Sequence, residues 1–291
     1  MTHPWSAWPA PAKLNLFLHI VGRRDDGYHL LQTVFQLLDW GDSVHLRVRS
    51  DGAIARAGEL PGVALENDLC LRAAQLLRER SGTLAGVDIR VDKRIPIGGG
   101  LGGGSSDAAT TLVALNELWQ TRLSPADLAA LGLELGADVP AFVHGQSAWA
   151  EGVGELLTPV ALPPRAFVIL DPGVSVPTGP LFQAPELTRN MAPATIGGFF
   201  AGMETTNIFT PVVRARYAQV AAAMDWLNQF GEARLSGSGG CVFVAVDSAA
   251  EADTIVRTCP ASFTAYRAGG LDKSPLLDAV AVFKACAATT D

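Results

Sequence analysis

The sequence predicts a two-domain protein of the α+β class, and three observations support this expectation. Near the N-terminus, apolar and polar side chains alternate with the period of half-buried strands, whereas later segments repeat apolar residues with the period of a helix. A proline-rich segment, LTPVALPPRA at 157–166, precedes a new apolar strand pattern. With 291 residues, 48% of them hydrophobic, the chain has enough material for two cores, which we expect over 1–160 and 161–291.

Individual elements follow from the same periodicities. Strands are expected at 14–20 and 44–48, where apolar residues occupy every second position. Val87, Ile89 and Val91 alternate with charged residues and predict another strand, which Pro96 ends. The remaining patterns predict helices over 68–80, 125–135 and 213–230 and strands over 167–170 and 241–246. Both halves therefore mix helices and strands.

Composition argues against several kinds of partner. The net charge of −7 and the pI near 5.2 disfavour nucleic acid and membrane surfaces, because proteins that bind those usually carry a basic excess. The N-terminal MTHPWSAWPAPAK has no signal-peptide pattern, and no uncharged stretch reaches the roughly 18 apolar residues of a spanning helix. The sequence has four cysteines, Cys70, Cys241, Cys259 and Cys286, and no two of them have the spacing of a CxxC pair. We therefore expect a cytoplasmic protein with reduced thiols.

The stretch IPIGGGLGGGSSDAATTL, residues 95–112, places six glycines in seven residues between a predicted strand and a predicted helix. Ser105 or Ser106 is a suitable N-cap, and Asp107 is expected to point outward in the first turn. Backbone N–H groups at a helix N-terminus attract anions, and glycines let a phosphate approach them closely. The lysine of a Walker loop and the acidic residue that follows a dinucleotide fingerprint are both missing. We therefore expect a phosphate-binding loop of another type.

Four motifs, in this order, resemble those of the GHMP kinase superfamily, which includes galactokinase and the homoserine, mevalonate and phosphomevalonate kinases. They are PAKLNLFLHIVGRRDDGYHLLQTVFQ, the glycine loop in the form P-x-x-x-G-L followed by S-S, LGADVPAFVHG and LSGSGG, and they run from Pro11 to Gly240. The resemblance implies an N-terminal domain like domain 2 of ribosomal protein S5, a ferredoxin-like C-terminal domain and a substrate cleft between them.

The resemblance also implies an ATP-dependent kinase whose glycine loop holds the nucleotide phosphates, with Mg²⁺ carried by ATP. The implied ATP-binding residues are Pro96, Gly98, Gly99, Gly100, Leu101, Gly102, Gly103, Gly104, Ser105 and Ser106. The late glycine motif contributes Ser236, Gly237, Gly239 and Gly240. The magnesium ligands are not named by the motifs, and Ser105 or Ser106 is a candidate because Mg²⁺ prefers oxygen ligands.

Lys13 and Asp138 are the catalytic residues that the resemblance implies. From the residues alone, Lys13 reads as an exposed lysine at the end of a strand, and Asp138 as the N-cap of a short helix starting at Val139. The resemblance instead places Lys13 near the transferring phosphoryl group and Asp138 at the attacking hydroxyl. Asp138 then either accepts the proton or mainly orients the hydroxyl. A non-catalytic protein of this fold would be expected to lack one of the two.

The implied substrate is a small molecule, a cytidine diphosphate conjugate of methylerythritol, and another kinase of the superfamily, such as a homoserine or mevalonate kinase, is the alternative. The implied substrate-binding residues are Asn15, Tyr28, His29, Thr178 and Phe182, with Tyr28 and Phe182 on opposite faces of the base. One departure stands out. The second domain keeps Asn207 of an N-D-x-E motif but replaces its acidic residues with Ile208 and Thr210.

Overall fold

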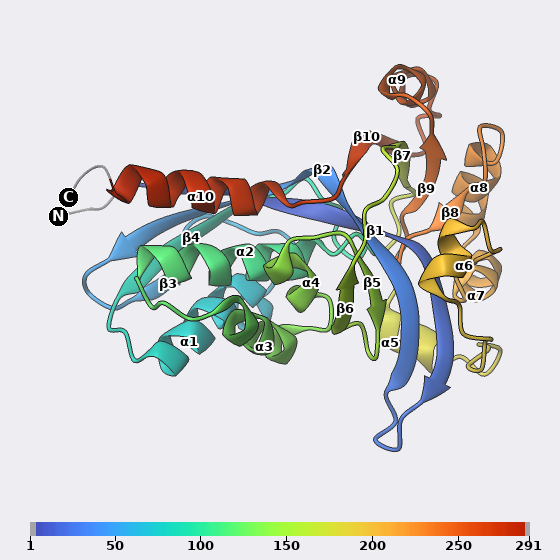
Figure 1. The fold of residues 1–291 in the computed structure, drawn as a ribbon. Coiled ribbons are helices and arrows are strands. Elements are labelled where there is room, and N and C mark those ends of the chain that lie inside the picture. Colours follow the sequence, from blue (N-terminus) through green and yellow to red (C-terminus); the bar gives the residue numbers. More distant parts are fainter. Residues whose placement is uncertain (1–3, 289–291) are drawn as a thin grey trace.

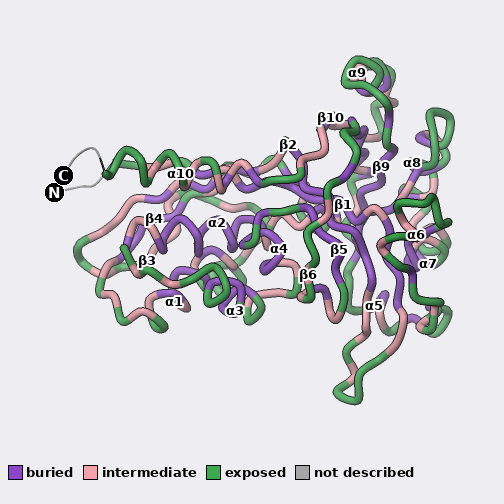
Figure 2. Tube along the Cα trace, viewed as in Figure 1, coloured by how far each residue is buried: buried purple, intermediate pink, exposed green. Residues whose placement is uncertain are grey.

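The structure is a computed structural model that describes residues 4–288. Its most extended feature is an antiparallel hairpin of β1 (Ser6–Arg23) and β2 (His29–Arg49), which runs along both halves of the molecule (Figure 1). Figure 2 shows buried residues along most of this hairpin and exposed residues at its tip. The predicted strands at 14–20 and 44–48 are therefore parts of two much longer strands.

The first half packs helices onto one end of this hairpin. The further strands of this half are β3 (Ile54–Arg56), β4 (Gly86–Asp92), β5 (Ala148–Glu151) and β6 (Leu156–Pro159). Strand β4 pairs with one part of β2, and β5 pairs with another part. Its helices are α1 (Leu69–Ser81), α2 (Gly103–Leu118), α3 (Pro125–Leu135) and α4 (Val139–His144), after a 3-10 turn at Leu65–Asn67. Helix α2 is the centre of this core, since it contacts β1, β2 and the three other helices.

The second half is an antiparallel sheet with helices around it. Its strands, in the order β10-β7-β9-β8, are β10 (Thr264–Leu271), β7 (Ala166–Asp171), β9 (Val242–Val246) and β8 (Arg234–Leu235). Its helices are α5 (Thr178–Phe182), α6 (Ile196–Phe200), α7 (Thr210–Arg216), α8 (Ala218–Leu227) and α9 (Ala249–Arg257). The end of β10 also pairs with β2, so one sheet connects the halves and the α+β class is confirmed.

The last helix, α10 (Pro275–Ala288), returns to the first half (Figure 1). It contacts β1 and α2, and the ring of Phe283 lies 5.5 Å from that of Trp8. We propose that the boundary between the two halves lies near residue 160, where the chain first passes from one half to the other. The chain crosses a second time between β10 and α10, so 161–291 is not confined to the second half.

Local sequence rules account for several elements. Helix α3 has the predicted bounds because Ser124 and Asp127 form a reciprocal capping box. Asp68 caps α1 by accepting hydrogen bonds from the backbone of Cys70 and Leu71. The prediction of one continuous helix over 213–230 is wrong. The segment is divided into α7 and α8 at Tyr217, whose backbone is extended with φ −127° and ψ 92°.

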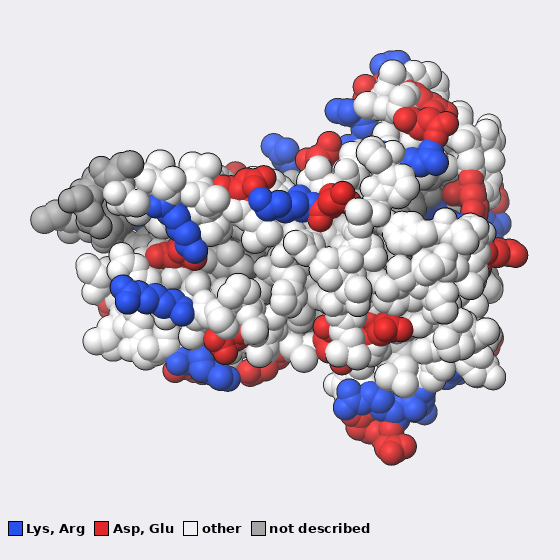
Figure 3. All heavy atoms as spheres, in the orientation of Figure 1, with Lys and Arg blue, Asp and Glu red and all other residues white. Residues whose placement is uncertain are grey.

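Two further observations concern the surface. On the face drawn in Figure 3, basic and acidic side chains are interspersed, so the net charge of −7 is not gathered there in one area. Within residues 4–288, no helix combines the length and the apolar composition needed to cross a bilayer.

Candidate active site

A cavity of about 1170 Å³ lies between the two halves. The glycine loop and the start of α2 line one part of it, Lys13 and Asp138 line the middle, and the tip of the β1–β2 hairpin lines another part together with α5. The predicted site residues that line it are Lys13, Asn15, Tyr28, His29, Pro96, Gly98, Gly99, Gly100, Leu101, Gly102, Gly103, Gly104, Ser105, Asp138, Thr178, Phe182 and Gly237. The fold thus gathers segments from both halves around one space.

Close contact with the late glycine motif explains why the loop needs several of its glycines. A Cβ at Gly100 would overlap the carbonyl oxygen of Ser236, and a Cβ at Gly239 would overlap the backbone of Gly100. The two loops are also hydrogen-bonded, because the N–H of Cys241 donates to the carbonyl of Gly99 at 3.0 Å. Gly98, Gly100 and Gly102 have φ of 73°, 79° and 74°, a region that favours glycine. The glycines therefore serve the packing of one loop against the other.

Helix α2 begins at Gly103, with Gly102 in the N-cap position, so the predicted N-cap at Ser105 or Ser106 is wrong. The left-handed backbone of Gly102 lets the turn close before the serines, which lie in the first helical turn. Ser105 lines the cavity, whereas Ser106 is fully buried, and its Oγ has no hydrogen-bond partner among residues 4–288. Gly104 has room for a side chain, since a Cβ there would meet only Leu69, at 3.6 Å.

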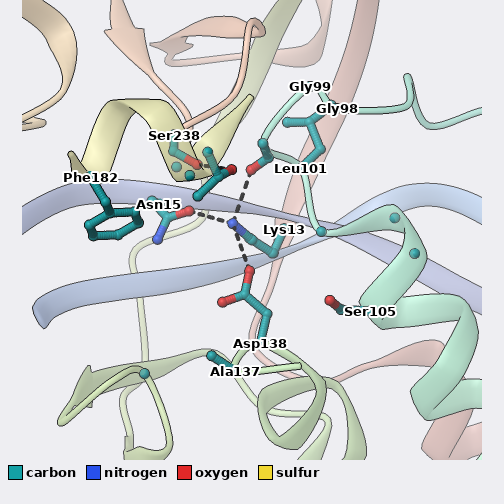
Figure 4. Close-up of a pocket in the computed structure, with 18 of the residues that line it drawn as sticks. Lys13, Asn15, Gly98, Gly99, Leu101, Ser105, Ala137, Asp138, Phe182 and Ser238 are labelled. Atoms are coloured by element: carbon teal, nitrogen blue, oxygen red, sulfur yellow. Dashed lines mark hydrogen bonds and ion pairs between the residues drawn. The ribbon is translucent and has the colours of Figure 1, made fainter. Parts of the chain in front are cut away.

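Lys13 is buried in the middle of β1, with 4% of its side chain exposed, and is not the exposed strand-end lysine that its local pattern predicts. The register of β1 against β2 shifts between Pro11 and Lys13 and again after Asn15, and such irregularities re-aim side chains. Nζ donates to Oδ1 of Asn15 and, at 3.0 Å, to the carbonyl of Gly100 (Figure 4). It also lies 3.3 Å from Oδ2 of Asp138.

Asp138 occupies the N-cap position of α4 but makes no capping hydrogen bond with its side chain. Figure 4 shows its carboxylate turned towards Lys13 from below, opposite the glycine loop. About a third of the side chain, 34%, is exposed. The carboxylate is thus held by Lys13 on one side and open to the cavity, where a hydroxyl group can reach it.

A second set of hydrogen bonds holds these groups in place. Nδ2 of Asn15 donates to Oγ1 of Thr33 at 2.9 Å, and this contact fixes the amide with its oxygen towards Lys13. Oγ of Ser236 donates to the carbonyl of Gly100 at 3.0 Å. Asn207 is buried, and its Nδ2 donates to the carbonyl groups of Leu235 and Gly237. Sequence reasoning missed Thr33, and it noted Asn207 only as the retained residue of a motif. Their contacts appear only once β1, β2 and the late motif are adjacent.

The position of Ile208 bears on the missing acidic residues. Its side chain is buried in the apolar core of the second half. A carboxylate there would have to be buried without a charged partner from that core, which is costly. At this position the chain therefore places an apolar residue that packs into the core.

Asp107 is buried and does not point outward as predicted. Lys93 donates to Asp107 at 2.7 Å and also to Asp42, which in turn accepts from the backbone of Ile95. Burial raises the pKa of Asp107 to about 7; Lys93 opposes this shift and Asp42 adds to it. Two carboxylates share one ammonium, and this shared contact turns Asp107 inward beside the glycine loop.

The other end of the cavity carries aromatic side chains. Tyr28 is 64% exposed at the hairpin tip, and the rings of His29 and Phe182 lie 5.0 Å apart at 32°. Phe182 also contacts the ring of Phe209 edge-on at 4.9 Å. Oγ1 of Thr178 lies 2.7 Å from Oγ of Ser238 in the late glycine motif. A flat group entering here meets aromatic surfaces from both halves.

Arg189 is a further residue of this end that sequence reasoning missed. Its Nε donates to Nε2 of His29 at 3.2 Å, and its other nitrogens donate to three backbone carbonyl groups of 182–187. Burial, followed by the charges of Arg189 and Arg23, lowers the pKa of His29. No local pattern around Arg189 marks it, because its importance comes from a contact with a distant hairpin.

Comparison with known proteins places this chain and its fold among the GHMP kinases. The description "GHMP kinases N terminal domain" matches residues 68–146, and "GHMP kinases C terminal" matches residues 191–265. A crystal structure of homoserine kinase from Cytophaga hutchinsonii has a TM-score of 0.66, is 18% identical and covers 93% of this chain and 95% of its own, which shows the common fold.

Closer similarity is found within one branch of these kinases. The 4-diphosphocytidyl-2-C-methyl-D-erythritol kinase of Xanthomonas oryzae pv. oryzae (strain MAFF 311018) is 60% identical over 276 residues, or 94% of each chain. That of Xylella fastidiosa (strain 9a5c) is 60% identical over 275 residues, 94% of this chain and 92% of its own. A crystal structure of 4-(cytidine 5'-diphospho)-2C-methyl-D-erythritol kinase is 34% identical, has a TM-score of 0.76 and covers 91% and 99% of the two chains. The chain therefore belongs to the GHMP kinases and, within them, to the 4-diphosphocytidyl-2-C-methyl-D-erythritol kinase family.

Proposed function

We propose that the protein transfers the γ-phosphate of ATP to the 2-hydroxyl of 4-diphosphocytidyl-2-C-methyl-D-erythritol, in the non-mevalonate route to isoprenoid precursors. One observation carries the proposal. Nζ of Lys13 contacts both the carbonyl of Gly100 in the glycine loop and the carboxylate of Asp138. This places an ammonium group between the loop that suits phosphates and a carboxylate that suits a hydroxyl. The names and high identity of the relatives support the choice of substrate.

The proposed step is an in-line displacement at phosphorus. The hydroxyl oxygen forms a bond to the γ-phosphorus, the bond to the β,γ-bridging oxygen breaks, and ADP leaves with that electron pair. Lys13 stabilises the negative charge on the transferring group, and Asp138 orients the hydroxyl and accepts its proton. Positioning and charge stabilisation dominate phosphoryl transfer, so we assign Asp138 a larger part in orientation than in early proton removal.

Mg²⁺ is proposed to bind together with ATP, where it would neutralise charge on the phosphates. Within residues 4–288, no three His, Cys, Asp or Glu side chains gather as a metal site. Mg²⁺ usually keeps several waters and binds through phosphates and one or two protein oxygens. It therefore does not need a cluster of acidic side chains in the cavity. Of the two serine candidates, Ser105 lines the cavity and Ser106 does not, so Ser105 is the better proposal.

The aromatic end of the cavity is proposed to hold the cytosine. Tyr28 and Phe182 offer ring surfaces for stacking, and stacking tolerates any base. His29 offers a ring nitrogen for hydrogen bonding, which distinguishes bases. Thr178 and Ser238 also line the cavity, and the diphosphate is proposed to lie beside them.

A substrate panel tests the proposal. Purified protein with Mg·ATP is assayed for ADP release with the cytidyl conjugate, mevalonate and homoserine, with and without EDTA. We expect turnover of the cytidyl conjugate that needs Mg²⁺, and the Asp138→Asn variant, purified alongside, controls for contaminating kinases. Faster consumption of mevalonate or homoserine would contradict the proposed substrate and favour another kinase of the superfamily.

A further inference from the structure

The contact between Arg189 and His29 links the two halves at the aromatic end of the cavity. His29 begins β2 at the hairpin, whereas Arg189 follows α5 in the second half. The guanidinium is anchored by the carbonyl groups of Phe182, Ala184 and Leu187 at 2.8–2.9 Å. Its Nε is therefore held in position when it donates to Nε2 of His29.

This contact decides which ring nitrogen of His29 carries the proton. A guanidinium has only donors and stays protonated in proteins, so Nε2 must be the acceptor. A neutral imidazole with Nε2 as acceptor carries its proton on Nδ1. The lowered pKa of His29, caused first by burial and then by Arg189 and Arg23, agrees with the neutral form. His29 lines the cavity, and its Nδ1 is then a hydrogen-bond donor.

We infer that Arg189 is a positioning residue for base selection. It holds His29 as a hydrogen-bond donor, and a donor at this place favours the binding of cytosine over that of uracil. N3 of cytosine is a hydrogen-bond acceptor, whereas N3 of uracil carries a hydrogen. A fixed N–H facing that atom makes a hydrogen bond with cytosine and confronts a second donor in uracil. Without Arg189, the imidazole is free to move its proton to Nε2 and to accept the N–H of uracil. The inference rests on the proposed function for its ligand.

Two variants at Arg189 separate the fixing of the tautomer from general support of the loop. Arg189→Lys keeps a group that only donates, whereas Arg189→Gln introduces an amide that either donates or accepts. Loss of the carbonyl contacts is expected in both, and it raises KM for cytidyl and uridyl conjugates alike. Only Arg189→Gln is expected to lower the ratio of their kcat/KM values, by about tenfold, which is the size expected when one buried donor loses its partner.

The first test reads the tautomer without substrate. Protein labelled with ¹⁵N in its five histidines is studied by NMR, and His29→Ala assigns the His29 signals. We expect Nδ1–H in the wild type and in Arg189→Lys, and a mixture of tautomers in Arg189→Gln. A wild-type His29 protonated on Nε2, or an unchanged tautomer in Arg189→Gln, would overturn the inference whatever the substrate is.

The second test measures selectivity for the cytidyl over the uridyl conjugate in wild type, both Arg189 variants, His29→Ala and the double variant His29→Ala/Arg189→Gln. If Arg189 acts through His29, adding Arg189→Gln to His29→Ala leaves the ratio unchanged. An additional loss in the double variant, or an undiminished ratio in Arg189→Gln, would overturn the inference. A wild type that phosphorylates neither conjugate would contradict the proposed function instead, and the NMR result would still decide the role of Arg189.

Discussion

Nζ of Lys13 lies 3.3 Å from Oδ2 of Asp138, although one comes from the interior of β1 and the other from the start of α4. Only 4% of the lysine side chain is exposed. Its ammonium is therefore compensated almost entirely by groups of the protein, namely Asn15, the carbonyl of Gly100 and Asp138. Removal of one partner leaves a buried charge with poorer compensation, so the two residues are expected to act as a unit.

Asp138→Asn and Lys13→Met are each expected to lower kcat by about a hundredfold or more, with small effects on KM for ATP. Because both groups act on the same transition state, the double variant is expected to be scarcely slower than either single variant. Steady-state kinetics of the four proteins measure this, and Lys284→Met, an exposed lysine on α10, is the control. Losses that multiply in the double variant would show two independent contributions.

Gly100→Ala and Gly104→Ala are expected to change stability in opposite directions. Gly100 has φ 79°, and its Cβ would overlap Ser236, so alanine there destabilises the fold by about 1–3 kcal/mol or more. Gly104 is helical with room for a Cβ, so alanine raises the free energy of unfolding by a few tenths to about 1 kcal/mol.

The same pair separates packing from nucleotide binding. Gly104 lines the cavity at the start of α2, so its alanine variant is expected to raise KM for ATP although it stabilises the fold. Urea denaturation and ATP kinetics are measured on both variants. An unchanged KM for ATP in Gly104→Ala would show that the phosphates do not approach this position.

Asp107 is expected to make stability fall as pH rises. Its folded pKa is raised to about 7, above that of an unfolded aspartate near 3.9, so between these values the folded state holds a proton that the unfolded state has lost. The stabilisation is complete below the unfolded pKa and is lost as pH rises through the folded pKa, by at most about 1.4 kcal/mol per pH unit.

Asp107→Asn removes this titration and is therefore expected to gain stability relative to wild type as pH rises from 5 to 8. Urea denaturation at four pH values in this range measures the difference, and the exposed Asp25→Asn is the control. A difference between Asp107→Asn and wild type that does not depend on pH would show that Asp107 is ionised throughout the range.

Tyr28→Ala and Phe182→Ala are expected to raise KM for cytidyl and uridyl conjugates to a similar extent. Loss of one stacking surface removes about 1–3 kcal/mol of binding that does not depend on the base. Phe182→Ala also removes a contact with Phe209, so its thermal stability is measured in parallel. A strong change in the preference between the two conjugates in Tyr28→Ala would contradict a role limited to stacking.

Much of the architecture follows from neighbours in the sequence. The capping box of α3 and the alternation in β4 involve residues that are two to four positions apart, so their patterns predict the elements with nearly the observed bounds. The glycine loop between strand and helix is likewise a local signal, and the four motifs together identified the kinase superfamily. For the helix, the strand and the loop the sequence by itself was sufficient, because hydrogen bonding and side-chain periodicity within a segment decide them; the superfamily followed from the resemblance of the motifs.

The tertiary structure decided what those elements do to one another. Lys13 is buried because the glycine loop and α4 close over β1, and Gly100 must be glycine because Ser236 lies against it. Asp107 turns inward to share Lys93 with Asp42, against its local pattern, and Arg189 reaches His29 across 160 positions of the chain. These contacts depend on which distant backbones the fold places side by side, and a pattern within a single segment carries no record of its distant neighbours.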